Sequence, residues 1–296
     1  MQRLARLRNN IQTCFLGNPK AIDKVIACLL ARGHVLIEDV PGVGKTTLAS
    51  ALSRSLDVAL ARIQLTPDML PADVLGVTVW DQQKSEFHFK QGPIFANIVL
   101  ADEINRTTPR TQSALLEAMA EGQVSIDGHT RKLIDPFFVI ATQNPHEFEG
   151  TYFLPESQLD RFLMRINLGY PNRDDEQRIL TYDPTRSAIA NLRPVMTGQE
   201  LIDLQQQTQE IEIDPALVGY IVDIAQATRD SEHLQIGVSP RGSLALAAAA
   251  KATAVIAGRD YVVPDDITSN VLDVFAHRCI SNTYLHDADL NTVPRV

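Results

Sequence analysis

The 296-residue sequence has little cysteine, no excess of positive charge and no long hydrophobic run. Its three cysteines (Cys14, Cys28 and Cys279) are far apart and form no CxxC pair, so we expect neither a disulfide framework nor a zinc site. Acidic side chains number 36 against 27 lysines and arginines, and the resulting net charge of -9 opposes non-specific binding to nucleic acid. The most apolar window, 244–257, is interrupted by Lys251 and is too short to span a bilayer. We therefore expect no membrane span and a cytoplasmic protein.

Short apolar runs alternate with helical patterns over the first part of the chain. We predict buried strands over residues 34–37, 61–65, 98–101, 137–142 and 164–168. Helical patterns fall between them, as at 45–56 and at 111–121, where Gly122 provides a stop signal. This alternation is typical of an α/β fold with a parallel sheet.

The last part of the chain has a different pattern. Residues 215–228, 240–257 and 265–278 all read as helices, and no strand pattern appears after residue 201. Three prolines between residues 169 and 197 mark a boundary. We therefore predict an α/β core over residues 1–180 and a small all-α domain over residues 195–296.

A glycine-rich turn joins the first predicted strand to the next helix. Residues 39–46 read DVPGVGKT and depart from the phosphate-loop pattern GxxxxGK[ST] only where Asp39 replaces the first glycine. Glycines in such a loop let backbone N–H groups surround a β-phosphate, and the helix N-terminus adds partial positive charge. A surface turn before a helix is the alternative, but a strand before and a helix after favour the phosphate loop. The predicted ATP-binding residues are Pro41, Gly42, Val43, Gly44, Lys45, Thr46 and Thr47, with Lys45 reaching the β- and γ-phosphates and Thr46 ligating Mg2+.

Two carboxylates follow the predicted strand at 98–101. Parallel strands carry their last residues to the sheet edge where the phosphate loop lies, so we expect Asp102 to hold Mg2+, usually through water. Glu103 is the predicted general base that polarises the attacking water. After the strand at 137–142, Asn144 could hold that water or a γ-phosphate oxygen. Each feature alone is common in solvated loops or turns, and the upstream phosphate loop favours the catalytic interpretation.

Together these motifs resemble those of AAA+ ATPases and, more closely, of the MoxR family. The resemblance rests on residues 38–46, 102–106, 142–145 and 154–162 and extends over about residues 17–278. It implies a ring, usually a hexamer, with ATP at each subunit interface. Arg161 then matches the arginine finger that enters the neighbouring subunit's site, with Arg165 as a weaker substitute. The structural alternative for Arg161 is a local ion pair with Asp160.

A second arginine follows Ser239-Pro240 in the first turn of a predicted helix. Arg241 opposes the helix dipole there and needs a nearby anion, for which ATP is a candidate. The resemblance implies that Arg241 is the second sensor arginine of the family.

Two hairpins interrupt the α/β pattern. Asp127-Gly128 is a strong two-residue turn between residues 124–126 and 131–133, and a second hairpin covers residues 77–89. Both resemble the inserts of the helix-2-insert branch of AAA+ proteins, which point at the ring pore or at a partner. A purely structural surface role is an equally open interpretation.

The function that these motifs favour is Mg2+-dependent ATP hydrolysis that drives remodelling or chaperone-like assembly of a protein partner. The resemblance implies a partner with a von Willebrand factor A domain. A nucleic-acid-dependent motor is the alternative, favoured by Arg131 and Lys132 on the predicted hairpin around Asp127-Gly128 and opposed by the acidic charge. A GTP-binding switch or small-molecule kinase is a third class, and the guanine-reading Asn-Lys-x-Asp motif that a switch needs is missing.

Overall fold

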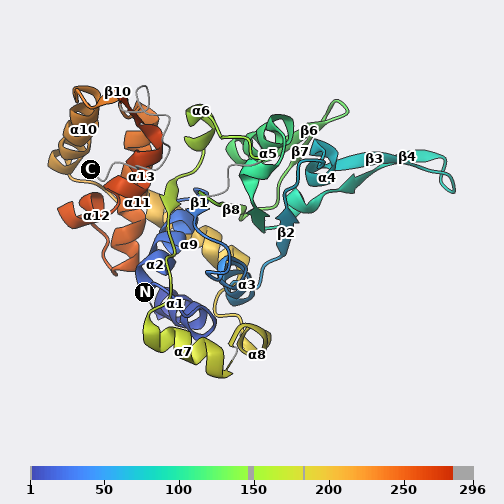
Figure 1. Ribbon diagram of the computed structural model, residues 1–296, viewed down its shortest axis with the longest axis horizontal. Coiled ribbons are helices and arrows are strands. Elements are labelled where there is room, and N and C mark those ends of the chain that lie inside the picture. The colour runs from blue at the N-terminus through green and yellow to red at the C-terminus, as the bar shows by residue number, and fades with distance from the viewer. Residues whose placement is uncertain (1, 146–149, 183, 283–296) are drawn as a thin grey trace.

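The structure, a computed structural model, describes residues 2–145, 150–182 and 184–282. Its centre is a five-stranded parallel sheet with the order β2-β5-β8-β1-β9. Strands β1, β2 and β8 of this sheet are labelled in Figure 1. The strands are β1 (Val35–Glu38), β2 (Leu60–Gln64), β5 (Ile98–Asp102), β8 (Phe138–Gln143) and β9 (Met164–Ile166). Each lies close to a predicted strand, and the α/β fold is confirmed.

The two faces of the sheet contribute to two separate hydrophobic cores. Val35 and Ile37 of β1 pack in the core that includes α1 (Gln2–Cys14), α2 (Pro19–Leu30) and α3 (Lys45–Ser55). The residue between them, Leu36, packs in the core that includes α5 (Pro109–Glu121). Successive side chains of a strand point to opposite faces, so a continuous apolar run allows helices to cover both.

The helices that were not predicted from the sequence include α1, α7 and α8. α1 buries Leu4, Leu7 and Ile11, which recur at helical spacing although arginines surround them. α7 (Arg173–Tyr182) and α8 (Pro184–Asn191) occupy the proline-containing segment that we interpreted as a boundary. α8 packs against α1 and α3, so this segment forms part of the core's surface.

Both predicted hairpins are present, and their facing sides meet. β6 (Gln123–Ile126) pairs with β7 (His129–Lys132) around Asp127 and Gly128, which both have positive φ. β3 (Gly76–Asp81) and β4 (Glu86–Gln91) form a ribbon that projects from the body of the molecule (Figure 1). The Arg131 guanidinium lies 4.1 Å from the centroid of the Phe89 ring, and this cation–π contact joins the two hairpins. Arg131 is one of the two basic residues that favoured the nucleic-acid alternative, and this contact occupies its side chain.

The C-terminal region forms a helical lid on the core. Its helices are α9 (Gly198–Glu210), α10 (Pro215–Arg229), α11 (Pro240–Ile256), α12 (Pro264–Thr268) and α13 (Val271–Phe275). α11 packs on α2 and α9, which connects the lid to the sheet's helical layer. Residues 283–296 of the predicted helical domain lie outside the described residues.

Two details of the lid differ from the prediction. A short antiparallel ladder joins β10 (Leu234–Ile236) to β11 (Ile280–Ser281), which are too short to give a strand pattern. The predicted helix at 265–278 is instead α12, α13 and the 3-10 turn η3 (Ala276–Arg278), because the chain bends at Ser269 and Asn270. Remaining short elements are α4 (Pro71–Leu75), α6 (Glu156–Leu159), η1 (Pro93–Phe95) and η2 (Ile104–Arg106). No helix in the described ranges is long and apolar enough to cross a membrane.

Candidate functional site

The candidate site lies at the carboxyl edge of the sheet, where β1, β5 and β8 end side by side. Because β8 separates β1 from β5, the end of β8 lies between the phosphate loop and the acidic pair. Thr142 of β8 links to both acids: its hydroxyl accepts the Glu103 N–H at 3.0 Å and donates to Asp102 Oδ1 at 3.3 Å. Thr142 belongs to the motif at residues 142–145 but was not predicted as a site residue. Its role depends on the pairing of β8 with β5, which the sequence alone does not show.

The phosphate loop has the open backbone that its sequence requires. Gly42 and Gly44 have φ of 91° and 94°, a region that residues with a Cβ rarely adopt. A Cβ on Gly42 would meet nothing within 4 Å, whereas one on Gly44 would lie 3.1 Å from the Phe15 ring. Gly44 is followed at once by α3, so the free N–H groups of the helix start belong to the same loop.

Asp39, the residue that replaces the first loop glycine, anchors the loop to the chain beyond β9. Its Oδ2 accepts the N–H groups of Leu168 and Gly169, both at 2.8 Å, and its Oδ1 accepts the N–H of Val40 at 2.9 Å. Such charge-assisted hydrogen bonds are stronger than neutral ones. Asp39 therefore closes the start of the loop in a way that glycine could not.

Lys45 lies within the loop and among the acids. Its Nζ donates a 2.6 Å hydrogen bond to the Asp39 carbonyl oxygen, so the side chain folds back over the loop. Burial lowers the pKa of Lys45, and the negative charges of Asp39, Asp102 and Glu103 act in the opposite direction. The charge of the lysine thus interacts with Asp102, the predicted Mg2+ ligand, and with Glu103, the predicted base.

The two carboxylates have different surroundings. Asp102 is buried, and its Oδ2 accepts a 2.7 Å hydrogen bond from Arg62 Nε on β2. Glu103 lies just beyond the strand with φ of 59°, a left-handed conformation that turns its side chain out of the strand direction. Its Oε2 accepts from Gln64 Nε2 at 2.9 Å and pairs with Arg106 Nε at 3.1 Å.

The remaining predicted residues lie on other elements. Asn144 follows β8 directly and is half-buried. Arg161 Nη1 donates a 3.0 Å hydrogen bond to the Leu116 carbonyl of α5 in the same chain. The structural alternative expected for Arg161 was an ion pair with Asp160, and the Leu116 carbonyl is the partner observed instead. Arg241 Nε lies 3.6 Å from Asp160 Oδ2, so this carboxylate supplies an anion next to the first turn of α11.

A small apolar pocket adjoins the phosphate loop and was missed in the sequence. It has a volume of about 110 Å³, and its lining residues are Cys14, Phe15, Leu16, Gly42, Val43, Gly44, Thr47, Pro171 and Ile179. An apolar slot beside a phosphate loop suits a flat heteroaromatic base. No local motif announces it, because the N-terminal segment, the loop and α7 meet only in the fold.

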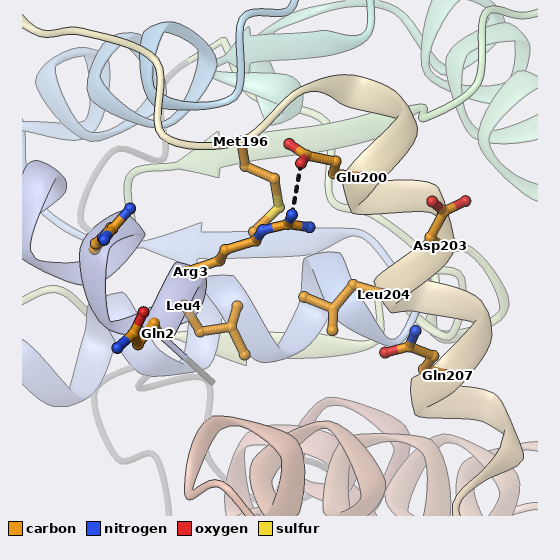
Figure 2. A pocket seen from close by; sticks show the side chains of 9 residues that line it. Gln2, Arg3, Leu4, Met196, Glu200, Asp203, Leu204 and Gln207 are labelled. Atoms are coloured by element: carbon orange, nitrogen blue, oxygen red, sulfur yellow. Dashed lines mark ion pairs between the residues drawn. The ribbon is translucent and has the colours of Figure 1, made fainter.

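A larger cavity of about 440 Å³ lies away from these motifs, between α1 and α9 (Figure 2). Arg3 and Glu200 form a 3.0 Å ion pair across it. None of the predicted site residues lines this cavity.

Comparisons with known proteins agree with this geometry. Residues 34–164 match the family described as the ATPase family associated with various cellular activities (AAA), and residues 226–294 match the AAA lid domain. The chain is 40% identical to chaperone MoxR1 of Mycobacterium tuberculosis, an alignment that covers 94% of this chain and 75% of that protein. It is 31% identical to protein MoxR of Methylorubrum extorquens, over 93% of this chain and 86% of that protein. The chain belongs to the MoxR family of AAA+ ATPases.

Two further comparisons extend this result. The chain is 55% identical to the uncharacterized protein YeaC of Bacillus subtilis, over 89% of this chain and 82% of that protein. A crystal structure from Cytophaga hutchinsonii, described provisionally as an ATPase, superposes with a TM-score of 0.89 at 35% identity. That match covers 96% of this chain and 88% of the other, so it includes both the core and the lid of this chain.

Proposed function

We propose that this protein hydrolyses ATP in a Mg2+-dependent reaction, as a homo-oligomeric ring, and uses the energy to remodel a protein partner. The observation that carries the proposal is the convergence at one edge of the sheet of Lys45, at the start of α3, with Asp102 and Glu103, at the end of β5. The chaperone name of the M. tuberculosis relative supports a chaperone-like role.

ATP would bind with its phosphates in the loop and its base in the adjoining apolar pocket. Residues Gly42 to Thr47 supply backbone N–H donors and the Lys45 ammonium, and the open space over Gly42 leaves room for a phosphate oxygen. Phe15 and Ile179 would contact the base. No part of this arrangement requires the larger cavity between α1 and α9.

Mg2+ would be held by the Thr46 hydroxyl and by Asp102, the latter through water. Thr142 and Arg62 fix the orientation of the Asp102 carboxylate, which retains lone pairs for such contacts. No cluster of three or more metal-ligating side chains occurs in the part of the chain that the structure describes, and Mg2+ sites commonly complete their shell with water and phosphate oxygens. The ion would neutralise charge that develops on the phosphate oxygens.

Glu103 is the proposed base. Its carboxylate is partly exposed and lies one residue beyond Asp102, so it can reach a water molecule near the γ-phosphate position. The Oε2 atom is held by Gln64 and Arg106, which leaves Oε1 to accept a proton. Asn144 would orient the same water through its side-chain amide.

Arg161 and Arg241 would complete the site in the assembled ring. We propose a hexamer in which Arg161 acts on the neighbouring subunit's ATP and Arg241 of the lid contacts its own. The core would then comprise residues 1–180 and the lid residues 195–296. The proposed partner carries a von Willebrand factor A domain, and the proposed location is the cytoplasm.

The test is the ATPase rate per subunit measured against protein concentration with Mg2+ present. We expect the rate to rise with concentration, and Arg161→Ala to lower it by about 10³-fold. Arg165→Ala is the matched comparison, because this half-buried arginine on β9 pairs with Glu38 at 3.4 Å. A flat rate that Arg161→Ala leaves unchanged would overturn the ring mechanism, and a loss in the Arg165 variant alone would move the finger there.

A further inference from the structure

A buried arginine of the lid holds the segment that carries Arg161. Arg278 lies in η3 and is 7% exposed, yet it contacts four acceptors in residues 160–163. Its Nε donates to Asp160 Oδ1 at 2.6 Å, and its Nη2 donates to the carbonyl oxygens of Asp160 at 3.2 Å and Phe162 at 2.7 Å. Nη1 donates to the Leu163 carbonyl at 3.2 Å.

These contacts leave residues 160–163 little freedom relative to the lid. A planar guanidinium imposes a fixed geometry on the groups that accept from it, which a lysine ammonium cannot reproduce. Because Arg161 lies between two of the residues that Arg278 contacts, its Cα position is set from both sides. The segment that carries Arg161 is therefore attached directly to the lid.

The start of α11 belongs to the same cluster. A Cβ on the buried Gly242 would lie 3.1 Å from Arg278 Cδ, so the first turn of α11 packs directly on the arginine stem. The neighbouring Arg241 reaches the second oxygen of Asp160 at 3.6 Å. One carboxylate thus joins Arg278, which is buried, to Arg241, whose side chain is 59% exposed and free to turn toward a nucleotide.

We infer that Arg278 is a positioning residue that fixes Arg161 to the lid, so that the arginine offered to the neighbouring subunit depends on the lid of its own chain. The inference rests on the proposed ring mechanism, in which Arg161 acts on the next subunit. It assigns Arg278 no contact with ATP.

The test combines kinetics with subunit mixing. Arg278→Lys should lower kcat by between about 10- and 100-fold with little change in the KM for ATP, because its own phosphate loop is intact while the arginine it offers is misplaced. Glu103→Gln subunits have an inactive site and a correctly held Arg161. Mixing the two variants should therefore restore activity at sites of the Arg278→Lys subunits, to the level reached when Arg161→Ala is mixed with Glu103→Gln.

A matched control separates positioning from general loss of lid stability. Arg259 in the lid donates two hydrogen bonds of 2.7 Å to the Asp266 carboxylate, about as short as the bond from Arg278 to the Asp160 carboxylate. These bonds hold Arg259 within the lid and not to residues 160–163. Arg259→Lys should destabilise the lid but retain kcat per folded subunit. If Arg278→Lys does not fold, Asp160→Asn replaces it, since this change removes the carboxylate and keeps the main-chain contacts of Arg278.

Each outcome has one meaning. Recovery in the Arg161→Ala mixture without recovery in the Arg278→Lys mixture would overturn the inference and leave the proposed function standing. Wild-type kcat in Arg278→Lys would also overturn it. Failure of both mixtures in assembled rings would instead overturn the action of Arg161 on its neighbour, and with it the proposed ring mechanism.

Discussion

The side-chain amide of Gln64 donates a 2.9 Å hydrogen bond to Glu103 Oε2, so the proposed base is tied to the neighbouring strand β2. This amide restrains the carboxylate, which is then less free to turn its Oε1 atom toward an incoming water. We therefore expect Gln64→Ala to raise the basal ATPase rate about two- to fivefold, which corresponds to the loss of one hydrogen bond of about 1 kcal/mol. Steady-state phosphate release measures it. Gln199→Ala removes a similar amide, which donates to Asp203 on the exposed face of α9, and should leave the rate unchanged. A reduced rate in Gln64→Ala would mean that the amide orients the base for reaction.

Removing the Glu103 carboxylate should separate binding from hydrolysis. Glu103→Gln keeps the shape of the side chain and removes the proton acceptor, so turnover should fall by about 10²- to 10⁴-fold while ATP still binds. Single-turnover hydrolysis and nucleotide-binding calorimetry measure the two effects. Glu117→Gln on the exposed side of α5 is the matched control. Normal hydrolysis by Glu103→Gln would show that another group is the base.

The pocket beside the phosphate loop should determine affinity rather than chemistry. Ile179→Ala removes part of its apolar lining and should raise the KM for ATP about 3- to 30-fold at nearly constant kcat, since the base contacts the pocket equally before and during reaction. Leu180→Ala is the control, because its side chain is 82% exposed. An unchanged KM in Ile179→Ala would place the base elsewhere.

The carboxylate of Asp39 should stabilise the fold as well as the loop. In Asp39→Asn, the side-chain NH2 group either points at the N–H groups of Leu168 and Gly169, where it cannot accept a hydrogen bond, or points away and leaves them a neutral acceptor. In both cases the charge-assisted hydrogen bonds are lost, so the free energy of unfolding should fall by about 2 kcal/mol or more. Urea unfolding followed by circular dichroism measures it. Asp81→Asn is the comparison, since Asp81 also accepts two backbone N–H groups but in an exposed hairpin turn. An equal, small effect in both variants would remove the special role of Asp39.

Acid should destabilise the protein through a buried histidine. Burial lowers the pKa of His34 from 6.5 to about 4, while its ring accepts the Val139 N–H and contacts the Met119 carbonyl. Between these pH values the unfolded chain binds a proton that the native chain does not, so stability is lost as the pH falls below about 6.5, by about 1.4 kcal/mol per pH unit at most. Burial also lowers the pKa of His277, which adds to the same trend.

Urea unfolding at several pH values between 4 and 7 checks this prediction. His34→Gln keeps one donor and one acceptor and should reduce the pH dependence, although it also costs stability at neutral pH. The control His129→Gln changes an exposed histidine of β7. A slope that His34→Gln leaves unchanged would assign the acid sensitivity to other groups.

The parts of the molecule that the sequence predicted are those fixed by local patterns. The strands were predicted from short apolar runs. The phosphate loop was predicted from the glycines beside Lys45, and Gly42 and Gly44 indeed adopt positive φ. Asp102 and Glu103 followed from the rule that parallel strands end at one edge.

What could not be predicted depends on contacts between distant segments. Phe15 and Ile179 are separated by most of the core domain and meet only because α1, the loop and α7 fold together. Asp39 looked like a departure from a motif, and its partners, Leu168 and Gly169, lie more than a hundred residues away. The anion beside Arg241 turned out to include Asp160 of the same chain, a pairing that no helix pattern encodes.

The projecting β3–β4 ribbon has a spectroscopic consequence. It carries Trp80, the single tryptophan of the chain, 52% exposed and in edge contact with Phe87 at 4.9 Å between ring centroids. Light absorbed only by tryptophan therefore excites one fluorophore at one place. Its emission reports what touches this ribbon, and the Phe87 ring beside it makes the signal sensitive to any change in the pairing of the two strands. The wild-type chain can thus be observed at this projecting ribbon without an added label.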